Sequence, residues 1–334
     1  MTAVTGSATD PGFLGLQRQL RTLLPQAEHA TPDQPMLERL GFSTEPPRLI
    51  SAAVIEGSTL RARRVFGSAE VGFAAFLDGT QASRVLAYAE GIPIVHGTVA
   101  AVVRVRRNQR LTTWNRPVVV QRIYAPVTKL ASTWRQALAG LSAPLVDTSD
   151  GTADEPEATD HPFSLRDAAI HRVQKDREAA ERELAERWCA VEKGNLLVDG
   201  GISGSERVAV SPCTVGVVKS HRTLYAQGES LATILRLRRG ERSSVFKITS
   251  PKRTTVSSWY LRFRDPAGHD PMWGLVRVEV AQPSRVEESA IGERADQVSR
   301  WIFAEVTPLA LPDSRWDKMV YGVRDCEEFL RAIT

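Results

Sequence analysis

The chain has 334 residues and a formal net charge of +4, a mildly basic balance that permits a nucleic-acid partner without requiring one. The hydrophobic and charged fractions, 42% and 25%, are those of an ordinary globular protein, which argues against a disordered or fibrous chain. Three scattered cysteines, Cys189, Cys213 and Cys326, exclude a zinc knuckle or disulfide framework and favour the reducing cytoplasm. We expect neither a secretory signal nor a membrane span, because no stretch approaches ~20 apolar residues.

Hydrophobic periodicity separates an N-terminal extension from one α/β domain. Residues 1–47 comprise a tail to about residue 12, a helical pattern over 13–24 and a proline-rich connector, and we expect the main domain over 48–334. Its first block has strand patterns followed by a helix near 129–141, and the predicted strands are 48–56, 61–66, 70–77, 92–106 and 117–124.

The second block begins after an acidic segment. Residues 146–164 contain six acidic residues and no Lys or Arg, which indicates a solvated linker or surface loop. Ser164 can cap a helix predicted over 165–191, because apolar residues recur there at helical spacing. The elements expected after it are a hairpin-like pair (195–199 and 208–219), a helix near 229–237, strands 244–249, 256–264 and 273–280, and helices 289–307 and 325–333.

Two segments share the pattern of an apolar strand followed by Asp and Gly. In the first, residues 71–77 lead to Asp78 and Gly79, and a carboxylate held at a strand end suits Mg²⁺ or Mn²⁺. Taken alone, this segment fits a hairpin turn better, since Asp-Gly is a common turn dipeptide. The second segment ends in Asp199 and Gly200, and two such strands side by side would bring both carboxylates to one point. Two-metal nucleases use that geometry, with ions ~3.5–4 Å apart.

A third carboxylate is expected from the helix over 165–191. We choose Glu181, which lies one turn before Leu184 on the apolar stripe, whereas Glu183 and Glu186 should face water. The alternative is that this charge-rich helix only solvates its outer face.

Basic residues form two candidate groups. Lys219 and Arg222 follow the strand after Asp199 and could contact a phosphate or the leaving group, and His221 could carry a proton. An edge-strand lysine and a structural histidine are the alternatives. Arg104 and Arg106 share one face of their strand, where DNA could run, although such arginines are most often only solvated.

The order of these motifs resembles the NurA nuclease family. The residues that carry the resemblance are Phe76-Leu-Asp78-Gly-Thr80, the acidic helix, Leu197-Val-Asp199-Gly200 and Val215-Gly-Val-Val-Lys219, and the similarity runs from about Phe76 to the C-terminus. The resemblance implies an RNase H-like mixed sheet flanked by helices, a DNA nuclease with two Mn²⁺ or Mg²⁺ ions, and a homodimer working with a HerA-type hexameric ATPase. It also implies that Asp78 and Asp199 bind metal, with Glu181 as the helix carboxylate between them.

The C-terminus departs from the family. Tyr321 is present, but the family's neighbouring proline and its helix histidine are not, and Asp325 or Glu328 could supply a carboxylate instead. We expect a cytoplasmic nuclease acting on DNA ends in repair or antiviral defence, as an exonuclease or a single-strand endonuclease, with Lys219 assisting the carboxylates. The alternatives are a catalytically silent adaptor of a translocase and an RNA-cleaving enzyme of the same fold.

Overall fold

The computed structural model describes residues 12–26, 28–29, 46–108, 110–149, 160–267, 269–283, 287–306 and 320–334. The helices are α1 (Gly12–Leu23), η2 (Val127–Lys129), α2 (Ser132–Ala139), α3 (Pro162–Val191), α4 (Glu206–Ala209), α5 (Gly228–Leu235), α6 (Glu288–Glu305) and α7 (Tyr321–Ile333). The central strands are β5 (Ala75–Ala89), β6 (Ile92–Arg107), β8 (Val118–Ala125), β10 (Leu196–Asp199) and β11 (Thr214–Val218). The others are β1 (Glu28–His29), β2 (Arg48–Leu49), β3 (Ala53–Val54), β4 (Ala62–Arg64), β7 (Arg110–Thr113), β9 (Leu145–Asp147), β12 (Thr223–Leu224), β13 (Glu241–Ser243), β14 (Phe246–Ile248), β15 (Val256–Arg262) and β16 (Leu275–Ala281).

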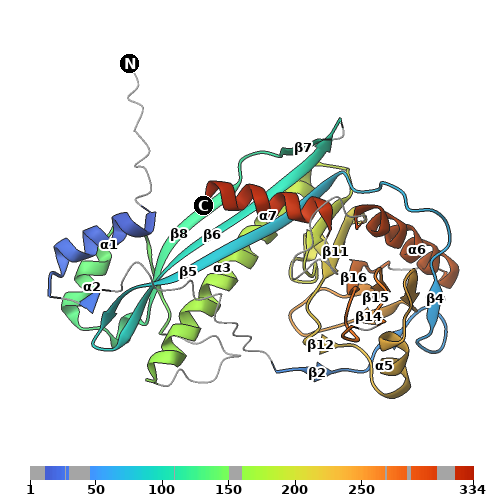
Figure 1. Cartoon of the computed structure of the whole chain (residues 1–334), viewed down its shortest axis with the longest axis horizontal. Helices are drawn as coiled ribbons and strands as arrows, with labels where there is room; N and C mark the ends of the chain where they lie inside the picture. The colour runs from blue at the N-terminus through green and yellow to red at the C-terminus, as the bar shows by residue number, and fades with distance from the viewer. Residues whose placement is uncertain are drawn as a thin grey trace.

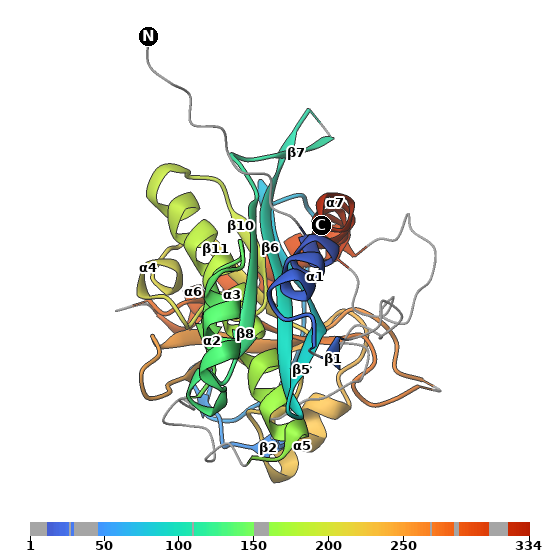
Figure 2. The ribbon, with the colours of Figure 1, turned by 90° about the vertical axis from the view of Figure 1, so that its left-hand side faces the viewer.

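The protein is α/β, with a large mixed sheet covered by helices. Within the described residues the main path of the sheet runs β3-β14-β15-β16-β11-β10-β5-β6-β8-β9. Strands β5, β10 and β11 are parallel neighbours, whereas β6 is antiparallel to both β5 and β8. The long β5–β6 hairpin lies between α3 on one face and α7 on the other (Figures 1 and 2). The expected mixed sheet flanked by helices is therefore confirmed.

Helix α3 covers one face of the β5–β6 hairpin through an apolar stripe. Its buried residues include Val173, Ala180, Leu184 and Trp188, which pack with Ala75 and Leu77 of β5. The helix begins three residues earlier than expected, with Pro162 at its start and the His161 side chain accepting a hydrogen bond from the backbone of Phe163. The prediction that Ser164 caps this helix is therefore wrong, since Ser164 lies inside the first turn.

Helix α7 packs on the opposite face, as strand alternation requires. Phe76, which lies between Ala75 and Leu77, joins the second core cluster together with Val323, Cys326 and Leu330 of α7. Gly322 permits the close approach, because a Cβ there would overlap the Phe76 ring. Side chains of β5 therefore alternate between the α3 side and the α7 side of the sheet.

Two expectations about the strands are corrected. Strand β5 does not end at Asp78: it pairs with β6 from Ala75 through Ala89, so Asp78-Gly79 is neither a strand end nor a hairpin turn. Long-range pairing with β6 outweighs the local turn signal of Asp-Gly. The expected hairpin-like pair consists of β10 and β11, which run parallel and are joined through α4. Parallel strands need a crossover rather than a tight turn.

The N-terminal helix belongs to the fold. Leu16 and Leu20 of α1 are fully buried and share a core cluster with Trp134 and Leu138 of α2, at the end of the hairpin far from α6 (Figure 1). The tail and most of the connector before residue 46, and residues 150–159 of the acidic segment, lie outside the described residues. Among the described helices, none is both long enough and apolar enough to cross a membrane.

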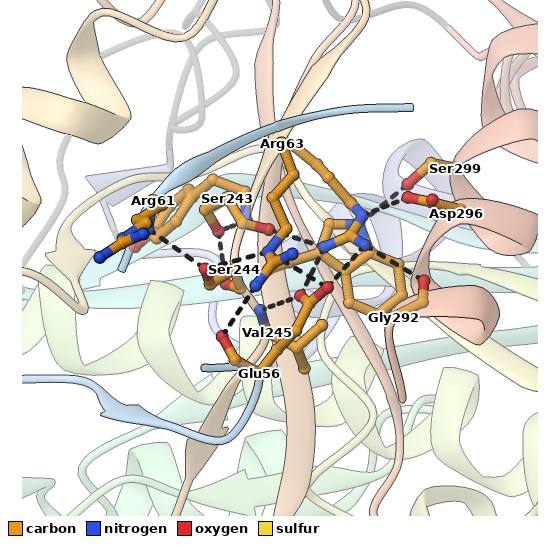
Figure 3. A network of polar contacts seen from close by, with 12 residues as sticks. Glu56, Arg61, Arg63, Ser243, Ser244, Val245, Gly292, Asp296 and Ser299 are labelled. Carbon is orange, nitrogen blue, oxygen red and sulfur yellow. Dashed lines mark hydrogen bonds and ion pairs between the residues drawn. The ribbon is translucent and has the colours of Figure 1, made fainter. Parts of the chain in front are cut away.

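A buried ion-pair network joins the other end of the sheet to α6 (Figure 3). Arg242 of β13 donates to both carboxylate oxygens of Glu56, at 2.6 and 2.9 Å, and to Asp296 of α6 at 2.5 Å. Glu56 also accepts from the backbone N–H of Val245 at 2.9 Å. These contacts satisfy a guanidinium that is almost completely buried, so Arg242 has a structural role.

Candidate active site

Asp78 is a buried carboxylate at the centre of the sheet. Its side chain is only 5% exposed, and its Oδ1 accepts a hydrogen bond from the backbone N–H of Gly79 at 2.8 Å. Within the described part of the chain, no Lys, Arg or His forms an ion pair with it. Burial raises the pKa of Asp78 well above its usual value, and the charges of Asp199, Glu181 and Glu327 raise it further while Lys219 opposes them. These charges therefore gather around one buried carboxylate.

Parallel pairing brings Asp199 beside Asp78. Val198 pairs with Leu77, so the next position on each strand is an aspartate. Lys219 follows β11, which is parallel to β10, and its Nζ donates to Asp199 Oδ2 at 2.9 Å. Both side chains are half-buried. The structure thus brings together the two Asp-Gly segments and the basic residue that the sequence analysis singled out.

Glu181 of α3 lies beside Gly79, on the face of the sheet opposite to the one that Asp78 faces. Its side chain is buried and lies against Gly79, where a Cβ would come within 2.9 Å of Glu181 Cγ. The lack of a side chain at Gly79 therefore makes room for this carboxylate. Arg177, one helical turn earlier, forms an ion pair with Glu181 and donates to Gln81 of β5 at 3.1 Å. Burial raises the pKa of Glu181 to about 7, although Arg177 opposes the shift.

Of the other helix carboxylates, Glu183 is exposed, as expected. Glu186 does not simply face water, since it accepts a hydrogen bond from Ser205 Oγ at 2.6 Å.

Helix α7 supplies a fourth carboxylate that the sequence analysis missed. Asp325 pairs with Arg104 at 2.5 Å, and Glu328 pairs with Arg324 on the outer side of the helix. The Glu327 side chain is 13% exposed against 59% for Glu328, and it is Glu327 whose charge acts on Asp78.

The helical periodicity of α7 indicates that Glu327 faces the sheet. This residue lies four positions after Val323 and three before Leu330, both buried on the sheet side of α7. The helix predicted from sequence begins at residue 325 rather than at Tyr321. It therefore leaves out Val323, and the spacing from Val323 to Glu327 is not recognised as helical. Tyr321 itself is half-exposed at the first turn of α7.

The arginines expected to bind DNA have mostly intramolecular partners. Arg104 and Arg106 do share one face of β6, but Arg104 also donates to Thr113 Oγ1 and stacks on the Phe329 ring. Arg106 makes two hydrogen bonds to Glu305, at 2.9 and 2.8 Å. Of the two residues after Lys219 for which we expected a role, Arg222 is exposed to solvent. His221 has an intramolecular partner, since its Nε2 lies 2.8 Å from the Leu275 carbonyl oxygen.

An open pocket of about 590 Å³ leads to two of the carboxylates. Glu181 and Asp199 both line it, together with the loop that follows β10. Its walls also carry six basic residues from α3 and from the turn after β14: Arg172, Lys175, Arg177, Arg182, Lys252 and Arg253. Sequence patterns alone do not mark these residues as ligand-binding, because no local pattern shows that this turn meets α3.

Comparison with known proteins leaves the family open. No family model matches this chain, and no curated protein matches it.

The chemistry of the site must therefore be judged from its residues. Among the described residues, no group of three His, Cys, Asp or Glu side chains is arranged so that it could hold a metal ion. Lys219 pairs with Asp199, and Arg177 pairs with Glu181. All the acidic donors are nevertheless carboxylates, the ligands that Mg²⁺ and Mn²⁺ prefer. Asp78 has no ion-pair partner among the described residues, and either a proton or a bound cation would relieve the cost of its buried charge. In donor type, the neighbouring carboxylates of Asp78 and Asp199 fit a hard divalent cation.

Proposed function

We propose that this protein is a metal-dependent nuclease that hydrolyses phosphodiester bonds in DNA. The observation that carries the proposal is the adjacency of Asp78 and Asp199 on two parallel strands, with Asp78 buried and unpaired by any described cation. Carboxylates that raise one another's proton affinity in this way are typical of functional sites.

The topology supports an RNase H-like core. Strands β8, β6, β5, β10 and β11 lie in that order, β6 is antiparallel to both neighbours, and α3 crosses from β9 back to β10. This order and these directions are the ones expected of an RNase H-like sheet, which supports the proposal. They place the first and fourth strands of the core side by side, which is where Asp78 and Asp199 lie.

We assign each residue of the site a role. Asp78 and Asp199 would hold Mn²⁺ or Mg²⁺, Glu327 would add a carboxylate from the α7 side, and Glu181 would add one from the α3 side. A bound ion supplies an activated water and stabilises the leaving oxygen. Lys219 holds Asp199 and would donate to a phosphate oxygen brought beside it. Arg177 orients Glu181 toward Gly79.

The resemblance to the NurA family also suggests partners. The chain has no GxxxxGK[ST] loop, so a HerA-type hexameric ATPase would supply any translocation, and a homodimer acting on DNA ends would be the working form. The alternative, a silent adaptor, was suggested by the altered C-terminus. Glu327 weighs against it, since α7 still brings an acidic side chain toward Asp78.

Cleavage of end-labelled single- and double-stranded DNA, in Mn²⁺, Mg²⁺ or EDTA, tests this function. We expect metal-dependent cutting by the wild-type protein and loss of at least ~100-fold in Asp199→Asn, since removal of a metal ligand's charge exceeds the ~10–100-fold effect of its supporting contacts. Asp296→Asn is the matched control, because Asp296 is 24% exposed against 20% for Asp199 and each pairs with a cation. Equal activity of wild type and Asp199→Asn would overturn the proposal.

A further inference from the structure

Three basic residues that line the pocket above Glu181 and Asp199 have no ion-pair partner in the part of the chain that the structure describes. Arg182 of α3 and Lys252 and Arg253 of the turn after β14 are exposed, and within the described residues none of them pairs with a carboxylate. We propose that these three side chains bind the phosphates of a single DNA strand and direct it to Glu181 and Asp199. The proposal rests on the nuclease function above and specifies the form of its substrate.

The pocket is built from three segments held together by hydrogen bonds. The Thr254 backbone N–H donates to the Ser203 carbonyl at 3.0 Å, which ties the turn to the loop after β10. Ser205 Oγ in that loop donates to Glu186 of α3 at 2.6 Å. The three cations therefore lie on connected walls, and the binding surface is largely pre-formed.

The remaining cations of the pocket are already engaged. Arg172 lies 3.7 Å from Asp176, Lys175 lies 3.8 Å from Glu178, and Arg177 pairs with Glu181. A phosphate that met Arg182, Lys252 or Arg253 would break no such pair. Arg104 and Arg106 are different, because DNA could reach them only in competition with Asp325 and Glu305.

The size of the pocket favours one strand over a duplex. Its volume of about 590 Å³ falls in the ~300–1,000 Å³ range of pockets that hold drug-sized ligands, which suits one or two nucleotides. Duplex DNA, whose major groove alone is ~12 Å wide, is too large to enter. A bond at the level of Glu181 and Asp199 is therefore accessible in a single strand.

The lining predicts recognition of the backbone rather than the bases. None of its described residues is aromatic, so the pocket lacks the rings on which bases stack in many single-strand binders. Contacts to phosphates are independent of sequence and weaken as salt is added, because binding releases counterions. We therefore expect salt-sensitive binding with little sequence preference.

Fluorescence anisotropy of a labelled DNA strand of about 12 nucleotides, within the ~4–16 nucleotide sites of single-strand binders, tests the proposal. EDTA is present throughout, so metal-dependent cleavage does not interfere. The triple variant Arg182→Ala, Lys252→Ala, Arg253→Ala should bind at least ~10-fold more weakly, and its slope of log affinity against log salt should fall by about two, at ~0.7 per lost phosphate contact. The matched control is Arg236→Ala, Arg239→Ala, Lys247→Ala, which removes three exposed cations outside the pocket and should bind like wild type.

The outcomes separate this inference from the nuclease function. Wild-type affinity and salt slope in the folded triple variant, or equal weakening in the control, would overturn the inference even if Asp199-dependent cleavage were observed. Weakened binding in the triple variant alone, with no cleavage by wild type in Mn²⁺, would support the inference and overturn the nuclease. A duplex or an RNA strand bound more tightly than the DNA strand through the same three residues would contradict the assignment to single-stranded DNA.

Discussion

Replacing Gly79 by alanine tests how closely the sheet and α3 fit at the site. The new Cβ would lie 2.9 Å from Glu181 Cγ and 3.0 Å from Cδ, closer than the 3.4 Å at which ordinary contact begins, and its carboxylate oxygen is nearer still. Glu181 must turn away from β5 or α3 must move, although its neighbours Ala180 and Leu184 are buried in the core. Overpacking of this kind costs about 1–3 kcal/mol of unfolding free energy.

Urea unfolding measures that cost, and a double variant identifies its source. We expect Gly79→Ala to be destabilised by about 1–3 kcal/mol in the wild-type background and to cost almost nothing once Glu181→Ala has removed the clash. Gly204→Ala is the control, since nothing lies within 4 Å of a Cβ at that position. An equal cost of Gly79→Ala in both backgrounds would refute the contact between Gly79 and Glu181.

Three further changes have defined outcomes. Glu327→Gln should lower metal-dependent cleavage by ~10-fold or more, as loss of a supporting contact at a metal site does. The outward-facing Glu328→Gln is the control and should cleave like wild type. Equal rates of the two variants would exclude Glu327 from the site. Glu56→Gln should lower the urea-unfolding free energy by about 3–5 kcal/mol, because it leaves the buried Arg242 charge without its main partner; a change below ~1 kcal/mol would contradict that role. The pKa of Glu181 rises from 4.5 to about 7 on folding, so the folded protein binds more protons between these values and its unfolding free energy should fall as pH rises through them. In Glu181→Gln that fall should become smaller but persist, because the pKa of Asp78 is also raised on folding. Identical pH profiles of the two proteins would contradict it.

Local patterns were sufficient to predict several parts of the site. Two apolar segments ending in Asp-Gly predicted neighbouring strands, and β5 and β10 do lie side by side with Asp78 and Asp199 at adjacent positions. The helical stripe correctly predicted that Glu181 faces the sheet. Both predictions depend on short-range periodicity, which is set by backbone geometry.

Other features of the site depend on long-range contacts, which local sequence patterns do not show. The local sequence Asp78-Gly79 is typical of a turn, but in the structure it is part of a strand that pairs with β6. Its pairing partners on β6 lie more than twenty positions away in the sequence, where a local pattern does not reach. Arg104 and Arg106 have the spacing of a DNA-facing pair, but packing of α7 and α6 brings Asp325 and Glu305 against them. Lys252 joins the site only because the turn after β14 folds beside the loop after β10.

Direct binding of Mn²⁺ tests the central claim that these carboxylates form one metal site. Isothermal titration of the full chain with Mn²⁺ at about pH 8, where Glu181 is ionised and protons compete less for the ligands, should give saturable binding. Asp78→Asn keeps the shape of the side chain and removes its charge, and we expect it to bind Mn²⁺ at least ~10-fold more weakly, the lower end of the effect of losing a supporting contact. Failure of the wild-type protein to bind Mn²⁺, or equal binding by Asp78→Asn, would contradict the account.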